Sequence, residues 1–175
     1  PAVDPEIWEG DVAAAARLLR PHEGTGEDWA ILGETVTRAW TEGWDPLPMG
    51  ESMARIGLTL VGTRYVPHTL ELPGEEQVVV NLQELDCVTF VENVLALARF
   101  IRLARPDILE SQLRTQDLYV GLLREIRYRG GRLDGYGSRL HYFSDWIHDN
   151  EGRGLVRELT AELGGEVDPR AIDYM

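Results

Sequence analysis

The chain contains one cysteine, Cys87, at the point where a strand-like run gives way to a helical pattern. Residues 77–82 are rich in β-branched side chains, whereas apolar residues from Val88 to Ile101 recur at helical spacing. Asp86 is a good N-cap, so Cys87 would be the first residue of the helix. There the helix dipole and the free backbone N–H groups favour a thiolate and could stabilise an oxyanion on an attacked carbonyl. The position therefore predicts a cysteine nucleophile; the alternative is a small buried hydrophobic residue.

Length and composition limit the classes of protein that the chain can represent. With 175 residues, 43% of them hydrophobic, we expect one domain over residues 1–175. No run of 18 apolar residues is present, so we expect no membrane span. The formal charge of −13 makes nucleic acid an unfavourable partner, because phosphate binding depends on Lys and Arg. Local arginines are expected to solvate a helix end or to hold carboxylates; these are Arg124, Arg127, Arg129 and Arg132.

Metal-binding and proton-binding side chains are sparse in this sequence. A single cysteine excludes a disulfide within the chain and a cysteine-rich zinc site. The histidines show no local metal-binding spacing, so we expect no metal and no cofactor; they are His22, His68, His141 and His148. We expect His22 and His148 in solvated loops, whereas His68 could line a cleft beside Tyr65.

Helical patterns precede strand-like patterns along the chain. We expect helices over residues 4–20, 29–40, 51–61, 87–105 and 116–126, a loop over 62–71, and two strands over 139–148 and 154–159 joined as a hairpin. The apolar stripe from Trp29 to Trp40 is expected in the core. This order predicts an α+β fold with an N-terminal helical part over residues 1–61 and a second part over 62–175. Asp168 and Pro169 resemble a helix opening close to the end of the chain, which suggests a fragment.

Four segments resemble the signatures of one family. Gly-Thr-Arg-Tyr at residues 62–65 and Asp-Cys-Val-Thr-Phe at residues 86–90 are similar to signatures of the NlpC-type, papain-like cell-wall cysteine peptidases. Ile-Arg-Tyr-Arg-Gly-Gly at residues 126–131 and Ser-Arg-Leu-His-Tyr-Phe-Ser-Asp-Trp-Ile at residues 138–147 resemble the branch described as N-acetylmuramoyl-L-alanine amidase-like. The likeness runs from about Gly57 to Met175. It implies a papain-like fold in which the nucleophile begins a helix and an antiparallel sheet follows, incomplete in this chain.

The resemblance also implies an activity and a set of site residues. The activity is hydrolysis of the amide between N-acetylmuramic acid and L-alanine in peptidoglycan fragments, so the expected partner is a muramoyl peptide, in the periplasm or outside the cell. Cys87 would be the nucleophile, through an acyl-enzyme, and Tyr65 would orient the thiol or line the oxyanion site. The expected substrate-binding residues are Asp86, Arg139, His141, Tyr142 and Asp145.

One departure concerns the general base. Papain-like catalysis needs a histidine to carry the thiol proton and a polar residue to orient it, and the family's His-Val-Gly strand does not occur in this chain. We therefore expect the base and its orienting residue beyond Met175. His141 with Asp145 is the alternative pair, but positions four apart on a strand lie about 13 Å apart, which favours a role in the substrate pocket.

Other interpretations remain open at this point. Tyr142, Trp146 and Ile147 could be core residues, with Arg139 and Asp145 as an internal ion pair. The whole chain could be a non-catalytic module that binds muramoyl peptides, with a reactive thiol that does not turn over. Acyl transfer is a further alternative to hydrolysis, because both reactions share the acyl-enzyme.

Overall fold

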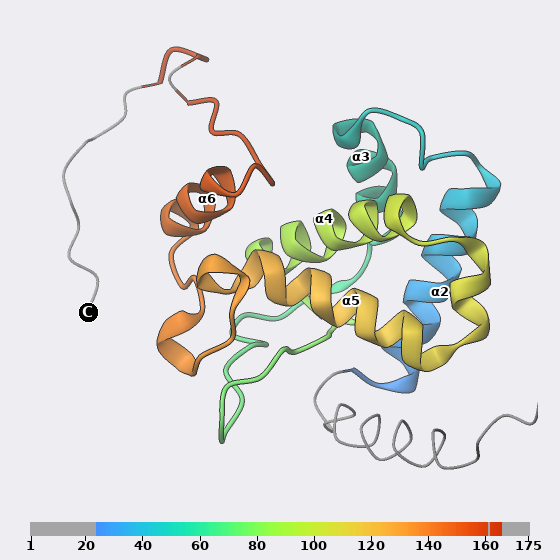
Figure 1. Cartoon of the computed structure of the whole chain (residues 1–175), viewed down its shortest axis with the longest axis horizontal. Coiled ribbons are helices and arrows are strands. Elements are labelled where there is room, and N and C mark those ends of the chain that lie inside the picture. The colour runs from blue at the N-terminus through green and yellow to red at the C-terminus, as the bar shows by residue number, and fades with distance from the viewer. Residues whose placement is uncertain (1–23, 161, 166–175) are drawn as a thin grey trace, which may run out of the picture.

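The computed structural model describes residues 24–160 and 162–165, and this part of the chain is mostly helical (Figure 1). Its α-helices are α2 (Gly26–Thr41), α3 (Met49–Thr59), α4 (Cys87–Leu103), α5 (Gln112–Arg127) and α6 (Phe143–Gly152). Short 3-10 helices lie between α4 and α6, namely η1 (Pro106–Glu110), η2 (Arg129–Gly131) and η3 (Tyr136–Ser138). The helix expected over residues 4–20 and the helix opening at Asp168 and Pro169 lie outside the described residues.

Helix α4 is the centre of the fold. Its middle, Val-Leu-Ala-Leu-Ala at residues 94–98, is apolar all round, and a helix of that kind needs neighbours on every side. Helix α5 runs antiparallel beside α4, and α2 and α3 also pack against it (Figure 1). The apolar stripe of α2 lies in this core as predicted: Leu32 and Val36 are fully buried, and Trp40 Nε1 donates to the Ile101 carbonyl at 2.9 Å.

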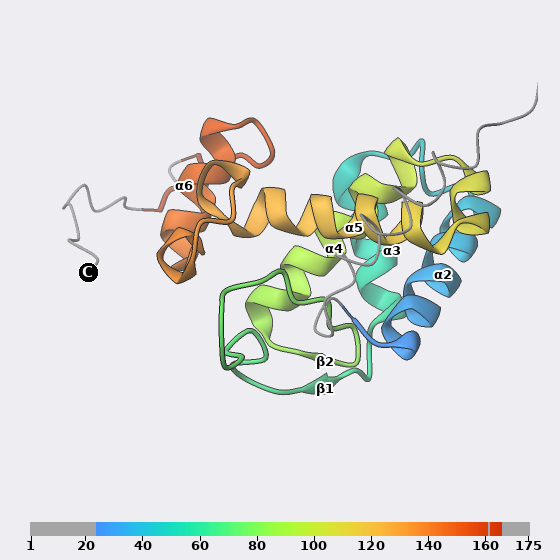
Figure 2. The same ribbon diagram turned by 60° about the horizontal axis from the view of Figure 1, so that its bottom comes forward.

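A small parallel sheet lies beside the start of α4 (Figure 2). Strand β1 (Arg64–Tyr65) pairs with strand β2 (Glu84–Leu85), with Arg64 opposite Glu84 and Tyr65 opposite Leu85. The described residues are therefore α+β in class, as predicted. The expected antiparallel sheet is not found among them: apart from the parallel pair they contain one isolated antiparallel bridge, between Tyr128 and Arg139.

The β-branched segment over residues 77–82 differs from the sequence prediction. It is buried but pairs with no strand of the described chain. Instead, the backbone carbonyls of alternate residues are hydrogen-bonded by side chains from α4 and from the end of α5. Tyr128 Oη lies 2.8 Å from the Gln77 carbonyl, Arg127 Nη1 donates to the Val79 carbonyl at 2.7 Å, and Asn93 Nδ2 donates to the Asn81 carbonyl at 3.3 Å.

The predicted hairpin over residues 139–159 is wrong. Residues 143–152 form helix α6, and residues 155–159 belong to no strand. The spacing of Phe143, Trp146, Ile147 and Asn150 is helical, and it brings Trp146 and Asn150 into the interior. Phe143 stacks on Trp146 with ring centroids 5.4 Å apart. The strand prediction rests on the β-propensity of the aromatic residues in this run, whereas the spacing of its apolar residues is that of a helix.

None of the described helices is long and apolar enough to cross a membrane.

Candidate functional site

Cys87 is the first residue of α4, and its side chain is exposed. The Asp86 carboxylate accepts hydrogen bonds from the backbone N–H groups of Val88 and Thr89, at 3.1 and 2.8 Å. Thr89 Oγ1 accepts in return from the Asp86 N–H at 2.8 Å, which completes a capping box. The predicted helix start is confirmed, and the alternative of a buried hydrophobic cysteine is wrong. An exposed sulfur at a capped helix start is reachable by a substrate.

The parallel strand pair brings Tyr65 to the same helix start. Tyr65 lies opposite Leu85 in register, and the Val66 N–H donates to the Leu85 carbonyl at 3.1 Å. Leu85 is two residues before Cys87, so the pairing fixes Tyr65 beside the entry to α4. The Tyr65 side chain is 69% exposed. The pairing thus places Tyr65 opposite a residue that lies two positions before Cys87, although 19 residues separate the paired residues in sequence.

An apolar rim continues from Cys87 along α4. Phe90, one helical turn after Cys87, is 36% exposed and shares its side of the helix. Its ring lies against Gly57 of α3 so closely that a Cβ at Gly57 would be 3.2 Å from Phe90 Cζ. Glycine at this position lets α3 approach, and the approach sets where the Phe90 ring lies.

A buried polar network supports the segment that leads to Cys87. Arg127 Nε donates to Glu92 Oε2 at 2.7 Å, while its Nη1 donates to the Val79 carbonyl. Tyr119 Oη donates to Asn93 Oδ1 at 2.6 Å, and this amide bonds the Asn81 carbonyl. Burial raises the pKa of the Tyr119 phenol, so it remains a donor. The Ile-Arg-Tyr motif thus anchors residues 77–81, a role that its local sequence does not indicate.

The residues expected to bind substrate lie in separate parts of the fold. Asp86 caps α4 at the site itself. Arg139 is nearly buried and pairs with Glu71 at 2.8 Å and with Glu76 at 3.1 Å, so it holds the 66–76 loop. Asp145 lies on α6 and pairs with Arg129 at 2.5 Å. The alternative of an Arg139–Asp145 ion pair is therefore wrong.

His141 and Tyr142 lie just before α6, not on a strand. His141 is exposed, its Nε2 lies 3.0 Å from the Tyr136 carbonyl, and its ring is 4.3 Å from the Tyr136 ring. The expectation that His141 and Asp145 share one strand face is wrong, because Asp145 lies in the first turn of α6. Tyr142 is 53% exposed and is not a core residue, whereas Trp146 is buried as the core interpretation required. A substrate-binding role for His141 and Tyr142 stays a prediction.

The other two histidines of the described chain are exposed. His148 lies on α6 rather than in a loop. His68 follows β1 and has a positive φ of 62°, in a turn where its carbonyl accepts from the Glu71 N–H at 3.0 Å. His22 lies outside the described residues.

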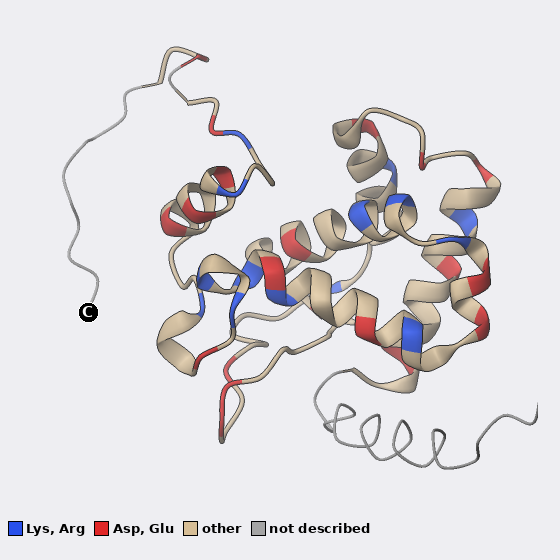
Figure 3. Cartoon of the chain, in the orientation of Figure 1, with Lys and Arg blue, Asp and Glu red and all other residues tan. Residues whose placement is uncertain are grey.

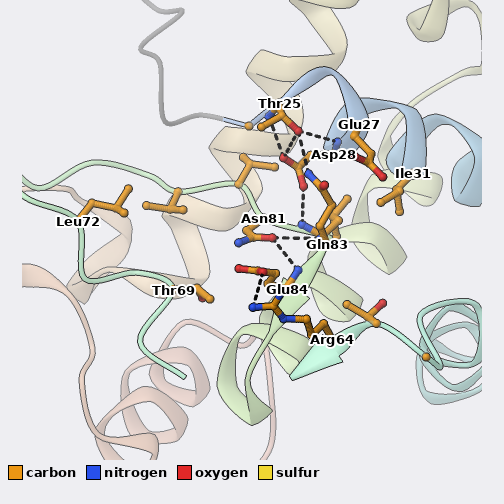
Figure 4. A pocket seen from close by; sticks show the side chains of 16 residues that line it. Thr25, Glu27, Asp28, Ile31, Arg64, Thr69, Leu72, Asn81, Gln83 and Glu84 are labelled. Atoms are coloured by element: carbon orange, nitrogen blue, oxygen red, sulfur yellow. Dashed lines mark hydrogen bonds and ion pairs between the residues drawn. The ribbon is translucent and has the colours of Figure 1, made fainter. Parts of the chain in front are cut away.

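One cavity lies beside the strand pair, on the side of α2. We call it the Asn81 pocket; it has a volume of about 760 Å³ and is lined by residues within the segments 24–31, 62–72 and 79–84. Figure 4 shows side chains of all three segments converging, with Asn81 between Thr25 and Glu84. Arg64 and Glu84 form an ion pair of 3.3 Å in its wall. Nothing in the sequence pointed to this pocket, because it joins segments that lie far apart along the chain.

Two of the arginines at the end of α5 and just after it are engaged in ion pairs. Figure 3 shows basic positions clustered at the end of α5 and in the 3-10 turns, interspersed with acidic ones. Arg127 holds Glu92, and Arg129 holds Asp145, as the sequence analysis expected of this group. Among residues 24–160 and 162–165, no cluster of three or more His, Cys, Asp or Glu side chains is arranged to hold a metal ion.

Comparison with known proteins gives the site a context. Two crystal structures of an N-acetylmuramoyl-L-alanine amidase from Bacteroides uniformis are similar, with 38% and 39% identity and a TM-score of 0.51 for each. They match 60% and 61% of this chain and 40% and 41% of their own. A proposed xylanase from Bacteroides fragilis is similar at 40% identity and a TM-score of 0.50, over 61% of this chain and 42% of that protein.

The chain thus spans about two fifths of the length of these relatives. A search of curated proteins found no significant match. A sequence model of one family matches residues 55–174, close to the range predicted from the motifs. The chain belongs to the AmiA-like, N-acetylmuramoyl-L-alanine amidase-like family.

Proposed function

We propose that the protein is a cysteine amidase of papain-like, NlpC type that cleaves the bond between N-acetylmuramic acid and L-alanine in peptidoglycan fragments. The observation that carries the proposal is the exposed Cys87 at the capped start of α4. Family membership supports an amidase acting on cell-wall material. The name of the B. uniformis relatives supports the particular amide bond. We propose that the protein acts in the periplasm or outside the cell, where such a substrate occurs.

The geometry suits nucleophilic attack by the sulfur. The Cys87 thiolate adds to the muramoyl carbonyl, and the developing oxyanion is stabilised by backbone N–H groups of the helix start. The carbon–nitrogen bond breaks, the nitrogen leaves with a proton as the amine of L-alanine, and a thioester remains on Cys87. Water then adds to the thioester carbon, releasing the muramoyl carboxylate and the free sulfur. We propose that Tyr65 lines the oxyanion side, because register pairing holds it beside this helix start.

The test is hydrolysis of an N-acetylmuramoyl-L-alanyl peptide, followed by the release of new amino termini. The wild-type protein should release a peptide that begins with L-alanine, and Cys87→Ala should reduce the rate to background. Cys87→Ser is the matched variant, because it keeps the size of the side chain and removes the sulfur. Unchanged turnover in Cys87→Ala would exclude the cysteine mechanism while leaving the family membership intact.

A second function is favoured by one observation. Among the described residues, the Cys87 thiol makes no hydrogen bond to a histidine, and His141 is engaged by the Tyr136 carbonyl. A protein with this arrangement and no further base would bind muramoyl peptides without turnover.

Alkylation separates the two functions when it is measured beside turnover. Iodoacetamide at pH 7 should label native Cys87 faster than the denatured chain if the helix start activates the sulfur. Fast labelling together with saturable binding and no product would support the binding module. Fast labelling together with product supports the amidase.

A further inference from the structure

We propose that the Asn81 pocket holds an N-acetylated saccharide, the sugar side of the bond that Cys87 attacks. This inference rests on the proposed function and names the part of the substrate that the pocket receives. It assigns no role in bond cleavage to the pocket residues. Their role would be to hold the acyl side of the substrate while the amine leaves.

The pocket begins close to the nucleophile. Glu84 lines it, and Cys87 follows three residues later, so the two Cα atoms are at most about 11 Å apart. On the opposite strand Arg64 lines the pocket, and the next residue, Tyr65, lies beside the helix start. The strand pair is therefore the boundary between the pocket and the Cys87 site. A group attached to the attacked carbonyl can lie in one while the carbonyl lies in the other.

The walls of the pocket are held in place by hydrogen bonds, one of them buried. Asp28 is 2% exposed, and its Oδ1 accepts from the Leu82 N–H at 2.8 Å. Its Oδ2 accepts from the N–H of Thr25, also at 2.8 Å, and Gln83 Nε2 donates to Thr25 Oγ1 at 2.9 Å. These bonds tie the start of α2 to the 81–83 turn. The pocket is thus preformed, as small-molecule sites usually are, and its 760 Å³ lies in their range of about 300–1,000 Å³.

One polar group without a partner, the amide nitrogen of Asn81, faces the cavity. Asn81 Oδ1 accepts from the N–H groups of Gln83 and Glu84, at 3.0 and 2.8 Å, which fixes the orientation of the amide. The amide nitrogen then points the other way, toward the side of the pocket where Thr69 and Leu72 lie (Figure 4). Within the described chain this nitrogen has no hydrogen-bond partner. A donor that is free and accessible in a pocket wall is a group that a ligand can use.

The charges in the pocket select for a neutral ligand. Glu27, Asp28 and Glu84 contribute three carboxylates, whereas Arg64 contributes the one guanidinium among the described lining residues and is paired with Glu84. A peptide with a free carboxyl terminus would be repelled by this excess of negative charge. Hydroxyl and acetamido groups carry no charge and can accept a hydrogen bond from the amide of Asn81. Ile31 and Leu72 supply apolar surface for the ring carbons.

The binding test uses N,N′-diacetylchitobiose, a neutral N-acetylated disaccharide, titrated into the protein and followed by calorimetry. Asn81→Asp keeps the acceptor for both backbone N–H groups and removes the N–H donors of the side-chain amide. It should weaken binding about tenfold, the effect of losing one well-placed hydrogen bond. Gln112→Glu is the matched control, because it adds the same charge at an exposed amide outside the pocket and should leave the affinity unchanged.

The kinetic test compares two substrates with the same scissile bond. One is N-acetylmuramoyl-L-alanyl peptide, and the other is the D-lactoyl-L-alanyl peptide, which lacks the sugar ring. Asn81→Asp should lower kcat/KM about tenfold for the first and leave the second unchanged. An equal loss for both substrates would overturn the proposal.

The outcomes separate this inference from the proposed function. Turnover that requires Cys87, without chitobiose binding at millimolar concentration, would overturn the saccharide site and leave the amidase. Chitobiose binding that depends on Asn81, without turnover, would support the saccharide site and contradict the amidase. Competition for the pocket by an L-alanyl dipeptide with a free carboxyl terminus would also overturn the saccharide site.

Discussion

Arg127 and Glu92 form an ion pair in which Nε and Oε2 are 2.7 Å apart and each side chain is 2% exposed. Burial opposes the charge of the guanidinium, but the attraction of Glu92 and its hydrogen bond outweigh this and raise the pKa of Arg127. The same guanidinium bonds the Val79 carbonyl. One residue of α5 therefore joins the first turns of α4 to the extended segment that precedes Cys87.

Breaking this pair should destabilise the protein strongly. Glu92→Gln or Arg127→Met leaves a buried charge without its partner, and we expect a loss of about 3–5 kcal/mol in the free energy of unfolding. Urea denaturation measures it. The exposed pair of Arg38 and Glu42 is the control, and Glu42→Gln should change stability by no more than about 0.5 kcal/mol. Similar losses at the two pairs would contradict the account of the buried one.

The Asp86 cap of α4 should contribute more stability than the Ser111 cap of α5. Asp86 accepts two backbone N–H groups at 3.1 and 2.8 Å, whereas Ser111 accepts one, from Arg114 at 3.4 Å, at the start of α5. We expect Asp86→Ala to reduce the free energy of unfolding by about 1–2 kcal/mol and Ser111→Ala by less, within the usual range for N-caps. Thermal and urea unfolding of the two variants provide the comparison. A larger effect at Ser111 would show that α4 begins elsewhere in solution.

The contact between Gly57 and Phe90 can be tested with a substitution that is normally favourable. Gly→Ala inside a helix stabilises by about 0.5–1 kcal/mol, and we expect that gain for Gly33→Ala in α2, where an added Cβ meets nothing within 4 Å. In Gly57→Ala the new Cβ would be 3.2 Å from Phe90 Cζ, so the gain should be lost. Phe90→Ala should restore it, which a double-mutant cycle of unfolding free energies would detect. Equal gains at both glycines would contradict the close approach of α3 to α4.

Local signals explain which parts of this structure the sequence predicted. The start of α4 at Asp86 depends on a capping residue and on apolar spacing within one helix, and it was predicted correctly. Residues 77–82 were predicted as a strand because their β-branched composition suits an extended backbone. The side chains that bond their carbonyls belong to Arg127 and Asn93, which are distant in sequence, so no local pattern predicts these bonds.

The errors near the C-terminal end have a related cause. Aromatic residues are common in strands, and the run around Phe143 and Trp146 was assigned by residue type. Its period of three and four residues fits the helix that is observed. The Asn81 pocket could not be predicted from any local pattern, since Thr25, Arg64 and Asn81 meet only after the strands have paired.

Alkaline pH should destabilise the protein through two buried tyrosines. Burial raises the pKa of the Tyr119 phenol, and burial together with the hydrogen bond to Glu76 raises that of Tyr128, both from an ordinary value of 10.0. Above pH 10 the unfolded chain therefore loses phenol protons that the folded chain retains. The contribution of the two protonated phenols to the free energy of unfolding is fully present below pH 10. It declines as pH rises above 10, by about 1.4 kcal/mol per pH unit for each tyrosine.

The sequence favours a clear measurement of this decline, because all 17 of its basic Lys and Arg positions are arginine. No lysine titrates in the same range. The free energy of unfolding, measured with urea between pH 8 and 11, should fall less steeply above pH 10 in Tyr119→Phe and Tyr128→Phe than in the wild type. Tyr136→Phe, which alters a side chain that is 57% exposed, should retain the wild-type slope. If all three variants showed the same slope, the two buried phenols would not be the groups whose ionisation unfolds the protein.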